Sequence, residues 1–70
     1  MQKQNNLRQI RKKLGFALLE LMATSGISTS TLVAIERYGL YPATDVRTRL
    51  SKALGVSELI IWPNGHSSNS

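Results

Sequence analysis

Glycines at positions 15, 26, 39 and 55 divide the sequence into segments that are too short for long helices. Within these segments, apolar residues recur every three or four positions, which is the spacing of one face of an α-helix. Leu7, Ile10 and Leu14 show this spacing directly before the first of the glycines. Pro42 prevents any helix from continuing through it. The pattern predicts five short helices, at about residues 5–14, 17–25, 28–38, 43–54 and 57–62.

The apolar positions of these segments are sufficient for one small core. Leu21, Leu32, Ile35 and Leu50 are expected inside it, because each lies on the apolar face of its segment, and Trp62 is expected to close it. A chain of 70 residues allows a single domain. We therefore expect an all-α fold, a compact bundle of four to five short helices, over residues 1–63. The polar residues 64–70 are expected to form a disordered tail.

The composition excludes several classes of protein. Without cysteine the chain has no disulfide and no Cys-based zinc site, and its one histidine is too few for an imidazole metal site. No apolar stretch reaches the roughly 18 residues of a membrane-spanning helix, and residues 1–6 lack the apolar region of a signal peptide. We therefore expect a cytoplasmic protein with no membrane, metal, cofactor or small-molecule partner.

The net charge of +5 points toward an anionic partner, with nucleic acid first and a membrane surface second. Five cations precede the first acidic residue: Lys3, Arg8, Arg11, Lys12 and Lys13. The run Arg8, Arg11, Lys12 and Lys13 is either a solvated helix face or a surface that attracts phosphate groups, and the sequence leaves both open. Three later cations, Arg47, Arg49 and Lys52, are expected to be surface charges. Either Arg47 or Arg49 could approach a nucleic-acid backbone.

The segment between the second and third predicted helices has the residues of a tight interhelical turn. Gly26 can take a positive φ without a steric penalty from a Cβ atom. Ile27 is expected to fill the corner between the two helices. Ser28 is a good N-cap, because its side-chain oxygen can accept a hydrogen bond from a free backbone N–H of the next helix. The turn from Ser25 to Ser28 therefore meets the requirements of a helix-turn-helix.

The order of these motifs resembles the Cro/repressor type of helix-turn-helix, the family that includes the lambdoid phage repressors. The matching segments are Ile10-Arg11, Gly15-Phe16, Glu20-Leu21, Gly26 to Leu32, Ile35 to Arg37, Pro42 and Leu50 to Ser57. The ending Ile61-Trp62-Pro63 is also similar to that of the small Ner-type regulators of transposable phages. The resemblance implies a lambda-repressor-like fold and a bacterial or phage-encoded regulator of transcription, a repressor, that binds double-stranded DNA. Homodimers on a two-fold operator are the family default.

The resemblance also implies roles for particular residues. The helix that starts at Ser28 would lie in the major groove. Five of its side chains would face the bases, and they are Thr29, Ser30, Thr31, Val33 and Ala34. Arg37, near the end of the same helix, would contact a phosphate. Backbone N–H groups that open the second and fourth helices would also meet phosphates. Arg11 and Glu36 match a family ion pair that ties the first helix to the third. Leu18 replaces a glutamine with which the family usually bridges to phosphate.

A second hypothesis keeps the fold and changes the partner. Leu18, Leu19 and neighbouring apolar residues would then bind another protein, as in an antitoxin or an antirepressor. Salt separates the two hypotheses, because DNA binding weakens steeply with salt and apolar pairing does not. An enzyme is not expected, since the four acidic residues are scattered and the sequence has neither a Gly-rich phosphate loop nor an ordered set of nucleophile, histidine and acid.

Overall fold

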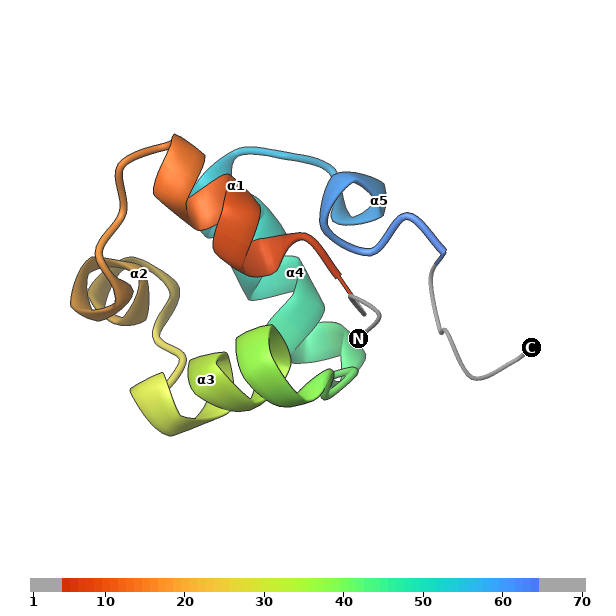
Figure 1. Ribbon diagram of the computed structural model, residues 1–70, viewed down its shortest axis with the longest axis horizontal. Coiled ribbons are helices and arrows are strands. Elements are labelled where there is room, and N and C mark those ends of the chain that lie inside the picture. The colour runs from red at the N-terminus through yellow and green to blue at the C-terminus, as the bar shows by residue number, and fades with distance from the viewer. Residues whose placement is uncertain (1–4, 65–70) are drawn as a thin grey trace.

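The computed structural model describes residues 5–64, which form helices and no strand (Figure 1). The five helices are α1 (Leu7–Lys13), α2 (Leu18–Ser25), α3 (Thr29–Tyr38), α4 (Thr44–Leu54) and α5 (Glu58–Ile61). The predicted all-α bundle is confirmed, with α1 shorter at both ends than expected. The predicted tail of residues 64–70 lies outside the described residues, apart from Asn64.

The first helix ends earlier than its apolar spacing predicted. The chain turns away through Gly15, which has a φ of 83° and whose N–H donates to the Lys12 carbonyl at 3.0 Å. This turn leaves Leu14 outside the helix as its C-cap and half exposed. The prediction that Leu14 continues the face of Leu7 and Ile10 is therefore wrong, because the reversal of the chain outweighs helical periodicity at this point.

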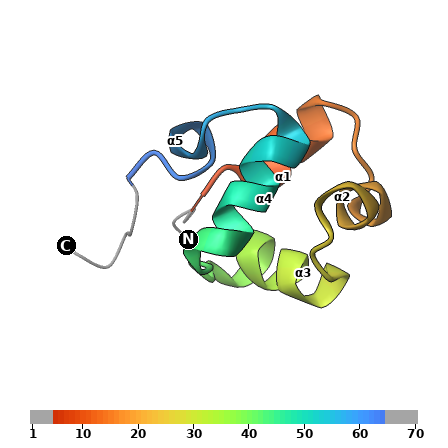
Figure 2. The ribbon, with the colours of Figure 1, turned by 180° about the vertical axis from the view of Figure 1, so that it is seen from behind.

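The core lies where all five helices meet. α4 packs against both α2 and α5, while α1 and α2 pack against α3, and the two opposite views show this arrangement (Figures 1 and 2). Every helix contributes at least one side chain with no exposed surface, and these are Leu7, Leu21, Leu32, Ile35, Leu50 and Ile61. Trp62 is also buried and closes the core, as predicted. Since no helix buries its apolar face alone, the bundle forms as a unit.

No single helix in residues 5–64 is long and apolar enough to cross a bilayer. α2 and α3 reach that length and composition only when they are joined, and they are bent by 118° at the break between them.

Arg47 connects the last helix to the start of α4. Its Nε donates to Glu58 Oε1 at 3.1 Å, its Nη1 to the Pro42 carbonyl at 2.7 Å and its Nη2 to Thr44 Oγ1 at 3.0 Å. The guanidinium also lies over the ring of Tyr41, 4.6 Å from its centroid. The side chain is only 17% exposed, so the prediction of a simple surface charge at Arg47 is wrong. Burial against an aromatic ring makes this arginine part of the packing.

Replacing Arg47 with lysine should lower the free energy of unfolding by about 1–2 kcal/mol, measured by urea unfolding with circular dichroism. Lysine keeps the charge, but one ammonium group cannot reproduce the fork that reaches three acceptors and stacks on a ring. Arg49→Lys is the matched control, because Arg49 is 53% exposed and pairs only with the neighbouring Asp45. The control should change stability by less than about 0.5 kcal/mol. Equal losses in the two variants would contradict the role assigned to Arg47.

Candidate nucleic-acid interface

The turn between α2 and α3 sets the direction of α3. Gly26 has a φ of 74°, and its N–H donates to the Met22 carbonyl at 2.8 Å. A Cβ atom here would be strained by the backbone and would lie 3.4 Å from a guanidinium nitrogen of Arg49. Ile27 is buried in the corner, as predicted. The 118° bend falls within the range of about 90–120° that is typical of helix-turn-helix units.

The first turn of α3 carries a cluster of hydroxyl groups. Ser28 Oγ accepts from the backbone N–H of Thr31 at 3.3 Å, which is the predicted N-cap. The same hydroxyl donates to Thr31 Oγ1 at 2.9 Å and lies 3.2 Å from Ser30 Oγ. A hydroxyl has one donor and two acceptor positions, so the exposed Ser30 retains hydrogen-bonding capacity toward a partner. The cap therefore orders the first turn of α3 and still leaves hydroxyl groups that can form hydrogen bonds with a partner.

Arg11 fixes the middle of α3 to α1 and to the start of the next connection. Its Nε and Nη2 donate to the two carboxylate oxygens of Glu36, at 2.7 and 3.1 Å, and its Nη1 donates to the Phe16 carbonyl at 2.8 Å. The side chains of Arg11 and Glu36 are 10% and 5% exposed. The hydrogen bond to Glu36 raises the pKa of Arg11 above its ordinary value, although burial acts in the opposite direction. The two residues predicted as an ion pair are therefore in direct, largely buried contact.

Asn5 is a second link between α1 and α3, and it was not predicted. Its side-chain Nδ2 donates to the Ile35 carbonyl at 3.0 Å, and its Oδ1 accepts from the Leu7 N–H at 2.9 Å. The residue is buried. An asparagine just before an apolar helical run is a typical capping residue, and that signal could have predicted the hydrogen bond to the Leu7 N–H. The contact with α3 is a tertiary one that no local pattern contains.

The structure places all six predicted DNA-contacting side chains on α3. Two of them are exposed, Ser30 and Arg37, and four are half-buried, Thr29, Thr31, Val33 and Ala34. None belongs to the buried core, which α3 enters through Leu32 and Ile35. The predicted set therefore lies on the part of α3 that the rest of the protein leaves at least partly uncovered.

Leu18 only partly fits the position that the alternative hypothesis gave it. The side chain is half-buried and packs against the core, whereas its neighbour Leu19 is 65% exposed. The prediction that Leu18 belongs to an apolar surface is therefore only partly met, because packing covers much of it. A leucine at this position contributes to the core, and it has no polar group with which to reach a phosphate.

Two helices of the interface begin without a side-chain cap. The N-caps of α2 and α4 are Ala17 and Ala43, and neither has a side-chain acceptor. In α2, Glu20 Oε1 accepts from the N–H of Ala17 itself at 2.7 Å. The backbone N–H groups in the first turn of each of these two helices therefore have no acceptor from an N-cap side chain. Such groups, with the positive end of the helix dipole, are suited to an anion.

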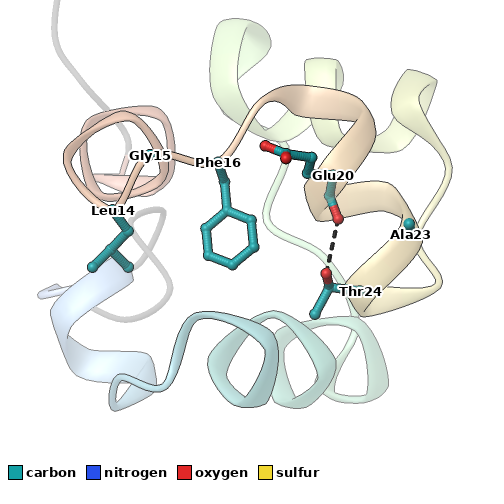
Figure 3. A pocket seen from close by; sticks show the side chains of 6 residues that line it. All are labelled: Leu14, Gly15, Phe16, Glu20, Ala23 and Thr24. Carbon is teal, nitrogen blue, oxygen red and sulfur yellow. Dashed lines mark hydrogen bonds between the residues drawn. The ribbon is translucent and has the colours of Figure 1, made fainter.

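A shallow pocket of about 310 Å³ lies between the end of α1 and α2 (Figure 3). Its lining consists of Leu14, Gly15, Phe16, Glu20, Ala23 and Thr24. Thr24 Oγ1 donates to the Glu20 carbonyl at 2.9 Å, and the Phe16 ring lies between the two helices (Figure 3). Glu20 is the only charged residue of the lining, so this pocket is unsuited to phosphate.

A model of the helix-turn-helix family matches residues 7–61, from the first residue of α1 to the last residue of α5. The chain belongs to this family, in its Cro/repressor type. It is therefore a DNA-binding helix-turn-helix domain, and its resemblance to the Cro/repressor type is confirmed. A search of curated proteins finds no match to this member of the family.

Replacing Glu36 with alanine should lower the free energy of unfolding by about 1–3 kcal/mol, because the variant leaves the guanidinium of Arg11 buried without its acceptors. Thermal or urea unfolding measures the loss. Asp45→Ala is the control, since it makes the same charge change in an exposed ion pair with Arg49 and should cost less than about 1 kcal/mol. An unchanged midpoint for Glu36→Ala would show that the pair does not hold the domain together.

Proposed function

We propose that this helix-turn-helix protein is a sequence-specific regulator of transcription, a repressor, that reads the major groove of double-stranded DNA with α3. The observation that carries the proposal is the way in which the rest of the domain holds α3 in place. It follows a tight turn after α2, is capped by Ser28, and is anchored by Leu32, Ile35 and Glu36, while its remaining side chains stay at least partly exposed. A helix held in this way can enter a groove without first being ordered.

The proposed reading face offers hydroxyl and methyl groups to the bases. Thr29, Ser30 and Thr31 can exchange hydrogen bonds with base edges or phosphates, while Val33 and Ala34 can meet the methyl group of thymine. None of these side chains is an arginine, asparagine or glutamine that could bind a base in bidentate fashion. Shape and backbone contacts would therefore carry a large share of the selectivity.

The backbone contacts of this proposal come from one side chain and two helix ends. Arg37 is exposed at the last turn of α3, where it forms no ion pair with any residue in the range 5–64. The uncapped first turns of α2 and α4 add backbone N–H groups. On a two-fold operator, a homodimer would place two copies of α3 about one helical turn apart. The protein would act in the cytoplasm as a non-enzymatic DNA-binding domain of residues 1–63, with no cofactor.

The exposed apolar side chains favour a second candidate function, a protein-interaction module on the same fold. Leu19, Leu59 and Ile60 are each more than half exposed, and exposed apolar residues that form a patch mark sites of protein interaction. A partner bound through these residues would be held by apolar burial. Its binding would then be nearly independent of salt, in contrast to DNA binding.

Ser30→Asp should weaken binding to DNA by at least about tenfold, because the variant places a negative charge against the phosphates and base edges. The fold should persist, since an acidic residue in the first turn of a helix is favourable. Fluorescence anisotropy with a mixed-sequence duplex of about two helical turns measures the affinity, and circular dichroism checks the fold.

Thr48→Asp is the control for net charge. Thr48 is exposed on α4, outside the proposed interface, and the variant exchanges a hydroxyl for a carboxylate in the same way. It should lower the affinity much less than Ser30→Asp. Equal affinities for the two folded variants would contradict the assignment of α3 as the reading face. Binding of the wild type that does not change with salt would instead support the protein-interaction module.

A further inference from the structure

The last helix has more apolar side chains than the core uses. Four apolar residues follow one another at this end of the domain, and they are Leu59, Ile60, Ile61 and Trp62. Only Ile61 and Trp62 are buried, whereas Leu59 is 67% exposed and Ile60 is 53% exposed. The packing of the domain therefore gives no reason for the first two apolar side chains. Neighbouring exposed apolar side chains of this kind are typical of a site of protein interaction.

Ile60 also lines a pocket between α5 and α1. The pocket has a volume of about 250 Å³, and its lining consists of Asn6, Gln9, Ile10, Lys13 and Ile60. Two hydrogen bonds hold α5 against the start of α1 at this place. The backbone N–H of Asn6 donates to the Ile61 carbonyl at 2.8 Å, and its Nδ2 donates to the Ile60 carbonyl at 3.1 Å. The apolar side chains of α5 and the charge on α1 thus keep fixed positions relative to each other.

The charge beside this pocket is positive and is not compensated by the domain. Lys13 is exposed and forms no ion pair within residues 5–64, and the lining of the pocket contains no acidic residue. The one carboxylate of α5 belongs to Glu58, and it accepts from Arg47 Nε at 3.1 Å. A partner that covers Leu59 and Ile60 would therefore also meet a cation, and carboxylates on that partner would be complementary to it.

A second copy of this chain is a poorer occupant than an acidic partner. In a two-fold dimer the same face of both copies meets, so every residue of the interface occurs on both sides. Such a dimer would bring the two copies of Lys13 toward each other, and the pocket lining has no carboxylate to separate them. Like charges across an interface oppose association. A nucleic acid would supply the negative charge, but its phosphates would leave the side chains of Leu59 and Ile60 without an apolar surface.

The face lies away from the proposed reading helix. α3 packs against α1 and α2, while α5 packs against α4. In both views of the domain, α3 and α5 lie on opposite sides of α1 and α4 (Figures 1 and 2). A partner on α5 would therefore leave the exposed side of α3 uncovered.

We propose that Leu59, Ile60 and Lys13 form a docking face for an acidic segment of another protein. Apolar side chains of that segment would cover Leu59 and Ile60, and its carboxylates would lie near Lys13. The proposal rests on the second candidate function, to which it gives a place and a partner chemistry. It also makes the two candidate functions compatible, because α3 would bind DNA on one side of the domain while the partner is bound on the other.

The charged part of the face is tested with a fluorescently labelled synthetic peptide, designed as a helix with leucine on one face and glutamate on the other. Fluorescence anisotropy measures its affinity for the full chain. Lys13→Glu should weaken binding by at least about fivefold, because it replaces attraction with repulsion. Lys52→Glu is the matched control, since Lys52 is also an exposed cation in the last turn of a helix and does not line the pocket. It should change the affinity by less than about twofold.

The apolar part of the face is tested with the same peptide and Ile60→Ser. This variant should weaken binding by about fivefold, because it removes apolar surface that the complex would bury. Leu40→Ser is the control, since Leu40 is 45% exposed but lies in the connection between α3 and α4. It should leave the affinity nearly unchanged. Circular dichroism checks that the variants are folded, and Lys13→Glu decides the case if Ile60→Ser is not.

Several results would overturn the docking face. One is a wild type that does not bind the peptide, or an affinity that stays the same in both Lys13→Glu and Ile60→Ser. Equal binding of a peptide with lysine in place of each glutamate would refute the acidic partner. Displacement of the peptide by duplex DNA would assign the face to nucleic acid, and a wild-type dimer that Ile60→Ser converts to a monomer in sedimentation would assign it to a second copy. A loss of binding in Leu19→Ser alone would refute this face but keep the protein-interaction candidate, now on α2.

Discussion

The guanidinium of Arg11 donates to acceptors in two other parts of the chain, and the position of α3 depends on these bonds. Glu36 lies on α3, and the Phe16 carbonyl lies in the connection that leads to α2. One side chain thereby links α1, the entrance to α2 and the helix proposed to read DNA. Because the pair is nearly buried, neither charge has a good alternative partner, and removing one would leave the other without compensation. The turn between α2 and α3, with Gly26 and the N-cap at Ser28, then determines the direction of α3.

The cations that stabilise the fold differ from those that remain exposed and unpaired among the described residues. Arg11 and Arg47 donate to acceptors in other elements of the chain, so they serve the fold. Arg8, Lys12 and Arg37 are exposed and form no ion pair among the described residues. The face of α3 that is proposed to read DNA is nearly uncharged, with small hydroxyl and methyl groups. In the proposed complex this face would fit closely into a groove, while attraction to DNA would come from exposed cations and helix ends.

Features encoded within a few residues could be predicted, and features that depend on packing between distant elements could not. Apolar spacing, glycine positions and Ser28 are local signals, so the helices and the turn followed from them. The buried pair of Arg11 and Glu36 was implied by resemblance alone, since these residues are 25 positions apart. The contacts of Arg47 with α5 and of Asn5 with α3 depend on how the helices pack against one another in the folded domain. Burial of Leu18 has the same origin, because the spacing within α2 does not determine which neighbour covers it.

The central claim is that α3 recognises particular base sequences. Selection of duplexes from a random DNA pool by the purified protein, followed by sequencing, tests it most directly. We expect enrichment of a defined motif, arranged for a dimer as two half-sites about 10 base pairs apart. A pool that remains without a motif after repeated rounds, while the protein stays folded, would contradict base recognition by α3. That result would favour a protein partner at the exposed apolar side chains.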